Sequence, residues 1–292
     1  MYKYDLGIVI LNYVDFNQTI KCVKNYLQQK SVSLYIVIID NKSPNNSYDS
    51  LKHAFKEYNN VTVLSSHYNG GYAFGNNVGI RYCIEKGISE HVVISNNDVL
   101  LLDELLLFKW KEKHVRIDNV GLTSPVMQVK GLETRYSAWK MPRFWDDVKS
   151  GSIVLEKLLG DSKCYETADL IKDESVVDCL PGSLLMFDLD VMKDIGMFDE
   201  GTFLYMEEVI LSKKLKEVDK TNYLITSLTY EHLYSATISS IYNDRNKRKI
   251  AFISKIHFAL KYRKDNYVKI IIIILSYLLG GVISRFKINK QK

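Results

Sequence analysis

Two asparagines and an aspartate interrupt an aliphatic stretch of the chain, VVISNNDVLL at residues 92–101. A short aliphatic run bounded by polar residues is typical of an interior parallel strand, and ligands bind beyond the carboxyl ends of such strands. A carboxylate at that place can hold Mg²⁺ together with the phosphate oxygens of a substrate. We therefore expect Asn96, Asn97 and Asp98 to lie in a ligand site, with Asp98 as a candidate metal ligand.

Three more loops have the same character, because each follows a predicted strand and carries polar or glycine residues. The carboxylate of Asp40 can accept hydrogen bonds from a base or a ribose. In HYNGGYAFGNNVGI, residues 67–80, the glycines permit close backbone approach, and we expect helix-leading amides after Gly75 to face an anion. The spacing is neither GxGxxG nor a P-loop, which disfavours a dehydrogenase and an ATPase. The candidate ligand-binding residues of the four loops are Asn12, Tyr13, Asp40, Asn41, Asn69, Gly70, Gly71, Gly75, Asn76, Asn96, Asn97 and Asp98.

Two adjacent acids, Glu207 and Glu208, stand near the predicted start of a helix. One interpretation is structural, because acids in the first turn stabilise a helix through its dipole by ~0.3–1 kcal/mol. The other is a general base, since burial and like-charge crowding raise a carboxyl pKa until the group can take a proton from a hydroxyl. The spacing alone does not decide between them.

Regularly alternating strands and helices must position these residues. The alternation predicts a mostly parallel sheet with right-handed crossovers, and it brings the four polar loops to one edge of that sheet as a single cleft. A broken strand at 175–188, a helix at 189–195 and the helix with the paired acids follow later in the chain. The early predicted strands are 6–13, 34–40, 61–66, 91–95 and 120–126, and the early predicted helices are 15–29, 48–58, 76–87 and 103–114.

The alternation is lost from 127 to 173, where Trp139, Phe144 and Trp145 stand among charged residues. These aromatic residues predict either a local packing cluster or a loop that covers the substrate. We divide the chain into a first domain at 1–244, with a nucleotide-binding half at 1–126 and an acceptor and catalytic half at 127–244, and a separate segment at 245–292.

Composition limits the classes of protein to consider. With 292 residues and 47% apolar content, the chain can bury a substantial core. Its four cysteines show no CxxC spacing, and its start has no basic and apolar pattern of a signal peptide. We therefore expect a reducing, cytoplasmic compartment.

The basic character of the chain is confined to its last segment. Residues 245–292 hold 13 Lys or Arg against the single acid Asp265, a net charge of +12, whereas residues 1–244 hold 26 basic and 33 acidic residues, a net charge of −7. The uncharged run at 270–284 is shorter than the ~20 residues of a membrane-spanning helix. We expect this segment to lie on the inner leaflet of a membrane rather than to cross it. The alternative is a buried terminal helix.

Four blocks of the sequence together resemble the inverting family 2 glycosyltransferases of bacteria, in particular the rhamnosyltransferase-like branch of surface polysaccharide synthesis. The blocks are IVILNY with IIDNKS, NGGYAFGNNVGI, ISNNDV, and GMFDEGTFLYMEEVIL preceding HLYS, and they occur in the family order. The resemblance implies the GT-A fold, an α/β fold with a Rossmann-like nucleotide-binding half, a nucleotide-sugar donor and a divalent metal, Mg²⁺ or Mn²⁺. It assigns metal binding to Asp98 and to His232, a lone histidine that without the resemblance is more often a core or surface residue.

The resemblance also assigns the general base. The family usually has Glu-Asp-x-Asp where this chain has Glu207-Glu208-Val209-Ile210, so the expected base is Glu208, and the second acid is missing. The implied reaction is a single displacement with inversion, from dTDP-rhamnose or a UDP-hexose to a hydroxyl of a glycan acceptor that is carried on a lipid. Two alternatives remain: a non-catalytic partner subunit that binds a nucleotide sugar, and a basic-tailed nucleic-acid binder. The acidic body and the aliphatic tail disfavour the second.

Overall fold

The computed structural model describes residues 2–129, 137–151, 165, 170, 172–233 and 243–289, with side chains up to residue 281. One mixed sheet runs through the molecule in the strand order β3-β2-β1-β4-β8-β6-β9-β5, with β7 beside β9. Helices cover both faces, and each face has its own apolar cluster. Alternate residues of β1 point to opposite faces, as Ile8 and Val9 show, so the strand is buried on both sides.

The first half of the sheet is parallel, as the sequence predicts. The strands β1 (Leu6–Asn12), β2 (Leu34–Asp40), β3 (Val61–Ser65) and β4 (His91–Asn96) all run the same way. The connecting helices are α1 (Phe16–Tyr26), α2 (Ser47–Ala54) and α3 (Gly71–Lys86). α3 begins about five residues before its predicted start, and that difference changes the interpretation of the glycine loop.

The second half of the sheet is mixed, which the sequence did not indicate. β8 (Leu184–Asp188) runs antiparallel between β4 and β6 (Val120–Gln128). The predicted broken strand at 175–188 is therefore two strands, because its first part forms β7 (Glu174–Val177) beside β9 instead. α4 (Leu106–His114), α7 (Leu189–Asp194) and α8 (Glu207–Glu217) lie close to their predicted positions.

β9 (Thr221–His232) is a long strand that our sequence analysis missed. Its sequence TNYLITSLTYEH is rich in β-branched and aromatic residues, so a strand signal was present. β9 runs parallel to β6, and its last residues pair antiparallel with β5 (Val99–Leu100), directly after β4. The strand thereby carries His232 to the carboxyl end of β4.

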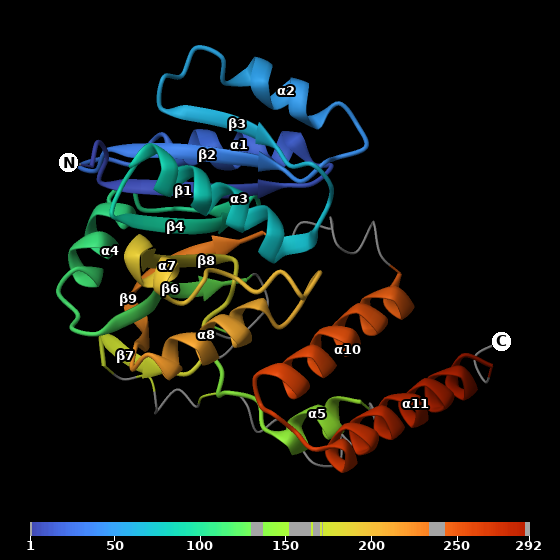
Figure 1. Ribbon diagram of the computed structural model, residues 1–292. Coiled ribbons are helices and arrows are strands. Elements are labelled where there is room, and N and C mark those ends of the chain that lie inside the picture. Colours follow the sequence, from blue (N-terminus) through green and yellow to red (C-terminus); the bar gives the residue numbers. More distant parts are fainter. Residues whose placement is uncertain are drawn as a thin grey trace.

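Three helices form a group beside the sheet: α5 (Phe144–Ser150), α10 (Asp244–Lys261) and α11 (Tyr267–Asn289) (Figure 1). α10 packs on α8 through the buried Phe258, and Ser254 Oγ donates a 2.8 Å hydrogen bond to the carbonyl of Leu204. The expected division at 244/245 therefore falls within the first turn of a helix that packs against the rest of the fold. Within the described residues, no helix is both long enough and apolar enough to cross a membrane.

Of the aromatic residues singled out in 127–173, Trp139 and Phe144 pack locally. Trp139 forms a backbone bridge with Cys179 and packs on the cluster around Phe258. Phe144 packs against α11, whereas Trp145 is 63% exposed. The described cysteines, Cys22, Cys83 and Cys179, are buried and free, and Cys164 lies outside the described residues.

Candidate active site

The carboxyl ends of β1 and β2 are joined by a buried polar network. Asn12 and Asp40 are register partners, and the amide of Asn12 donates a 2.8 Å hydrogen bond to Asp40 Oδ1. Ser43 adds two more, from Oγ to Oδ1 at 2.6 Å and from its backbone N–H to Oδ2 at 3.1 Å. Thr19 Oγ1 donates to Asn12 Oδ1 at 2.7 Å. Asp40 is only 2% exposed, and its carboxylate orders the loop that follows β2. A base or ribose would therefore meet a carboxylate that is already held in place.

The glycine loop is tied to the same network. The Asn41 amide donates to Asn69 Oδ1 and to the carbonyl of Gly71, both at 3.0 Å, and the backbone N–H of Gly71 donates to Asn69 Oδ1 at 3.1 Å. Because α3 begins at Gly71, its first backbone amides are those of Gly71 and Tyr72 and do not lie after Gly75 as we predicted. Both amides already donate within the protein, to Asn69 Oδ1 and to the carbonyl of Phe203.

Gly75 has a packing role instead. It lies inside α3 over β1, where an added Cβ would come within 2.3 Å of Leu11 Cδ1. Asn76 in the next position is fully buried and donates to the carbonyl of Tyr72 at 3.1 Å. Gly75 therefore allows the helix to pack closely on the sheet, and Asn69, Gly70 and Gly71 are the part of the predicted glycine motif that lies at the start of α3.

Asp98 and His232 meet at the end of β4. His232 Nε2 lies 3.1 Å from Asp98 Oδ1, although 134 positions separate the two in the sequence. The pairing of β5 with β9 causes this, because Val99 and His232 are register partners. The two side chains are 8% and 11% exposed. Asn97 donates to Thr19 Oγ1 at 2.9 Å, and the backbone N–H of Asn96 donates to the carbonyl of Ser183 at 2.8 Å, so this loop too is held from both sides.

This pair suits a divalent metal. A carboxylate oxygen and an imidazole nitrogen at 3.1 Å offer two ligand atoms at the spacing of neighbouring ligands on one ion. Mn²⁺ accepts both kinds of donor, whereas Mg²⁺ prefers oxygen alone. Two protein ligands leave positions for the phosphate oxygens of a substrate, which is a usual arrangement for such ions.

The two acids begin α8 after a strained turn. Tyr205 and Met206 have φ of 71° and 74°, which lie in a left-handed backbone region that is uncommon for residues other than glycine, asparagine and aspartate. Glu207 is 3% exposed, and its Oε1 has no hydrogen-bond partner among the described residues. Burial, together with the neighbouring Glu208 carboxylate, raises the pKa of Glu207, and burial raises the pKa of Glu208. Such a pair retains a proton at pH values above those at which an ordinary glutamate loses it.

The loop before α8 contacts the glycine loop directly. Gly71 has φ of +86°, and an added Cβ would lie 1.9 Å from the carbonyl oxygen of Phe203. The backbone N–H of Tyr72 donates to that same oxygen at 3.0 Å, and its hydroxyl donates to the carbonyl of Gly182 at 2.5 Å. Burial and the nearby Glu208 and Glu207 carboxylates raise the pKa of Tyr72. Tyr72 therefore lies close to the paired acids.

Sequence analysis did not identify four of these residues. Thr19 and Ser43 orient Asn12 and Asp40, while Tyr72 and Ser183 join the glycine loop and the end of β4 to the turn before β8. Ser43 and Tyr72 stand within the blocks that carry the family resemblance, so that signal was available. Thr19 and Ser183 have no such signal, because their roles depend on which strands become neighbours.

The architecture is that of the GT-A glycosyltransferases. A mannosyltransferase from Pyrobaculum calidifontis, PcManGT, solved with GDP-Man and Mn²⁺, superposes with a TM-score of 0.60 over 95% of this chain and 70% of its own, at 14% identity. GalNAc-T7, solved with UDP, GalNAc and Mn²⁺, gives 0.59 over 91% of this chain and 52% of its own, at 12% identity. These likenesses establish the fold.

The chain belongs to glycosyl transferase family 2, whose model matches residues 7–173. It is 25% identical over 208 residues to the low-salt glycan biosynthesis hexosyltransferase Agl10 of Haloferax volcanii, and 26% identical over 191 residues to the rhamnosyltransferase WbbL of Escherichia coli K12. The matches cover 70% and 62% of this chain but only 59% and 65% of those relatives. The expected family and fold are confirmed.

Proposed function

We propose that this chain transfers a sugar from a nucleotide-sugar donor to a hydroxyl group of a glycan, with inversion at the anomeric carbon. The observation that carries the proposal is the 3.1 Å approach of His232 to Asp98 at the carboxyl edge of the sheet, in a fold whose solved neighbours hold Mn²⁺ with nucleotide sugars. The pair suits the metal that a leaving diphosphate requires. When bound, a divalent ion would stabilise the negative charge that develops on that leaving group.

The loops that follow β1 and β2, together with the glycine loop before α3, would hold the nucleoside and the diphosphate. Asp40 and Asn41 are fixed by internal hydrogen bonds before any ligand arrives, which reduces the ordering cost of binding. The glycine loop leads into a 16-residue helix, whose dipole favours an anion at its start, and the amides of Gly71 and Tyr72 fix that start through internal hydrogen bonds. The donor would therefore meet a rigid site.

Glu208 is the proposed general base, and Glu207 its modulator. Glu208 is half-buried and reaches the surface more than Glu207 does, so it can receive a proton from the acceptor hydroxyl. Burial raises its pKa toward the neutral range in which a base is most effective. The acceptor oxygen then attacks the anomeric carbon from the side opposite to the leaving diphosphate, which inverts the configuration.

A direct assay tests the transfer. The full chain with Mn²⁺ is offered a panel of nucleotide sugars, with dTDP-rhamnose and UDP-hexoses first, and product configuration is read by NMR. Transfer with inversion supports the proposal, whereas retention of configuration contradicts it. A chain that binds a donor but neither transfers nor hydrolyses it with any acceptor would instead be the non-catalytic partner subunit.

We also propose that α11 rests on the inner face of a membrane that carries the acceptor lipid. Ile270, Ile273 and Ser276 of this helix are buried against α5 and α10. The opposite face is aliphatic and exposed: Val268 65%, Ile271 54%, Leu275 53%, Leu278 55% and Leu279 61%. The helix thus packs on the protein with one side and presents an apolar side outward, as an interfacial helix does.

Basic side chains line a cavity beside the start of α11. This cavity of about 410 Å³ is lined by Arg143, Lys213, Lys216, Arg263 and Lys269, against the single acid Asp265. Each basic residue near an anionic surface adds ~1 kcal/mol of attraction. An anionic lipid surface therefore suits both the charge and the apolar face, and it would keep the cleft near a lipid-linked acceptor.

Surface substitutions test this association more cleanly than deletion of 266–292, which would also remove the buried side of α11. The triple variant Ile271→Ser, Leu275→Ser, Leu278→Ser should no longer float with phosphatidylglycerol vesicles. Val176→Ser is the control, because Val176 is 62% exposed on β7, outside this helix group. Flotation of the triple variant like the original chain would refute the interfacial assignment.

A further inference from the structure

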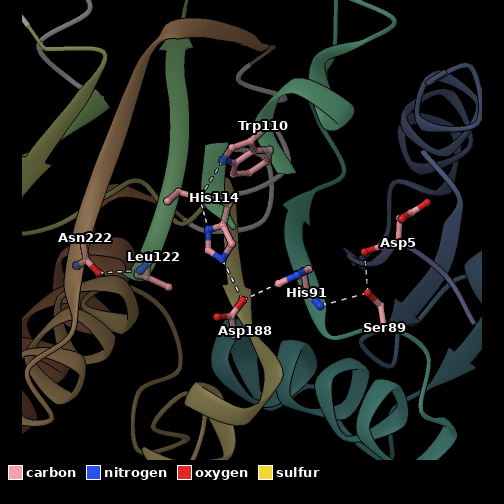
Figure 2. Close-up of polar contacts among 9 residues, drawn as sticks. Asp5, Ser89, His91, Trp110, His114, Leu122, Asp188 and Asn222 are labelled. Atoms are coloured by element: carbon pink, nitrogen blue, oxygen red, sulfur yellow. Dashed lines mark hydrogen bonds and ion pairs between the residues drawn. The ribbon is translucent and has the colours of Figure 1, made fainter. Parts of the chain in front are cut away.

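A second polar cluster lies at the other end of β4, away from the cleft (Figure 2). His91 begins β4, Asp188 ends β8, and His114 ends α4. His91 Nδ1 lies 2.6 Å and His114 Nε2 lies 3.1 Å from Asp188 Oδ1. His91 and Asp188 are register partners across the antiparallel pair, so the backbone itself sets the two side chains opposite each other.

We propose that His91, His114 and Asp188 bind a Zn²⁺ ion that fastens α4 to the sheet. The three ligand atoms lie within 4.8 Å of one another. Ligand atoms on one tetrahedral Zn²⁺ lie ~3.3 Å apart, given bond lengths of ~2.0–2.2 Å. The 3.1 Å distance from His114 Nε2 to Asp188 Oδ1 is already near that value, whereas the 2.6 Å distance from His91 Nδ1 to the same oxygen is shorter, so the His91 ring would move outward to admit the ion. Two imidazoles and one carboxylate form a donor set that Zn²⁺ uses.

The surroundings of His114 match those of a metal ligand. Its side chain is fully buried, and its second nitrogen, Nδ1, lies 2.8 Å from Thr123 Oγ1, which also accepts a 2.8 Å hydrogen bond from Trp110 Nε1. With the ion bound at Nε2, Nδ1 carries the proton and donates it to Thr123, whose oxygen can accept two hydrogen bonds. Without the ion, Nε2 donates to Asp188 and Thr123 donates to Nδ1. The same arrangement of His114, Thr123 and Asp188 therefore suits both the metal-bound and the metal-free protein.

Asp188 is free for this role although it stands at the N-cap of α7. An aspartate there usually caps the helix, but the Asp188 side chain makes no capping hydrogen bond and turns to the histidines.

The fourth ligand would be water. The side chains of His91 and Asp188 are 13% and 27% exposed, so solvent reaches one side of the cluster while His114 closes the other. The cleft pair contributes one oxygen and one nitrogen, whereas this cluster contributes two nitrogens and one oxygen. We therefore expect the two sites to differ in metal preference, with Mn²⁺ bound by Asp98 and His232 and Zn²⁺ bound by the histidine cluster.

The test uses the full chain with Asp98→Ala, so that the cleft no longer competes for metal. After removal of metal by a chelator, this chain is titrated with Co²⁺, whose visible absorption is strong at a tetrahedral site and weak at an octahedral one, and then with Zn²⁺ in competition. We expect one equivalent of the tetrahedral signal. Adding His91→Gln or Asp188→Asn should lower the affinity for Zn²⁺ by ~100-fold, and Thr123→Val by ~10-fold.

His53→Gln is the matched control, because His53 is an exposed histidine on α2 and should leave the signal unchanged. Circular dichroism of each variant separates loss of metal from loss of fold. The proposal is overturned if Asp98→Ala gives no tetrahedral signal, or if the signal persists in both His91→Gln and Asp188→Asn. In the first case the cluster is a hydrogen-bonded bridge alone.

Discussion

The two ends of β4 differ in how their polar side chains are satisfied. At the histidine end, His91 and His114 both hydrogen-bond to Asp188 in a contact between α4 and the sheet. At the cleft end, Asp98 meets His232, and Glu207 at the start of α8 keeps a buried oxygen without a hydrogen-bond partner among the described residues. The backbone before Glu207 is strained as well.

This difference separates a cluster that stabilises the fold, with or without an ion, from a site that leaves polar groups unsatisfied until a substrate binds. Polar groups that satisfy one another stabilise the fold, whereas buried carboxylates with raised pKa values and strained turns cost stability and persist where function requires them. Substitutions at the cleft end should therefore reduce binding or turnover with little loss of stability. Substitutions at the histidine end should do the reverse.

The largest effect should come from the metal pair. Asp98→Ala should abolish metal-dependent donor binding while leaving the thermal transition in place, because a loop carboxylate contributes little to the core. Calorimetric titration with a nucleoside diphosphate sugar in Mn²⁺ measures this. Unchanged donor affinity would show that Asp98 is not a metal ligand, and it would weaken the contrast between the two ends of β4.

Next in size is the loss of the base. Glu208→Gln should lower kcat by ~10² or more with donor affinity nearly unaltered, because the amide keeps the shape but cannot take a proton. Glu207→Gln should have a smaller effect. If the order of the two variants is reversed, the base is Glu207, and if neither loses turnover, the chain is a binding subunit.

Gly71→Ala should damage both binding and stability. The positive φ costs ~1–2 kcal/mol for an L-residue, and the new Cβ would press on the Phe203 carbonyl. Gly87→Ala is the matched control, because Gly87 has φ of +57° but no atom within 4 Å of the added Cβ. Urea unfolding should show a clearly larger loss for Gly71→Ala. Equal losses would show that the contact between the two loops is not important.

Asp188→Asn should lower the free energy of unfolding by ~2 kcal/mol at neutral pH in chelated protein, with no change in donor affinity. Hydrogen bonds hold the pKa of Asp188 below that of the unfolded chain, so its contribution is complete above pH ~3.9 and is lost as the pH falls further. The two curves should therefore converge in acid. Asp190→Asn, in the exposed next turn, should change little.

The smallest effect concerns pH. Burial raises the pKa values of Glu207 and Glu208, and the base must be unprotonated, so kcat/KM should fall on the acid side at a pH above the ~4.3 of a free glutamate. Glu207→Gln removes the competing charge, so this limb should move to lower pH. An acid limb at the ordinary glutamate value in both chains would contradict the shared-proton interpretation.

The parallel half of the sheet could be predicted because its strands and helices alternate locally. The rest could not, because β8 enters the sheet between β4 and β6 from a distant part of the sequence, and no local pattern records that insertion. β9 was missed although its composition favours a strand. The family resemblance supplied His232 as a metal ligand, which the residues alone had not favoured.

The site residues, like the strands, could be predicted where the signal was local and not where it depended on distant parts of the chain. Asp98 and the paired acids could be chosen from local sequence, whereas the clamp of Ser43 on Asp40 and the contact of Gly71 with Phe203 needed tertiary neighbours. Gly75 shows the opposite error: its glycine pattern suggested phosphate binding, but close packing on Leu11 is sufficient to require it. The histidine cluster has no sequence signal, because its members lie up to 97 positions apart.

The contact between Gly71 and Phe203 also has a kinetic consequence. The donor-side loop and the turn that carries the base share one carbonyl oxygen, so neither can shift without the other. If the donor binds at the start of α3 as proposed, it sets the position of Glu208 before the second substrate arrives. We expect compulsory-order kinetics, in which the donor binds first and the nucleoside diphosphate leaves last, with product inhibition competitive against the donor alone.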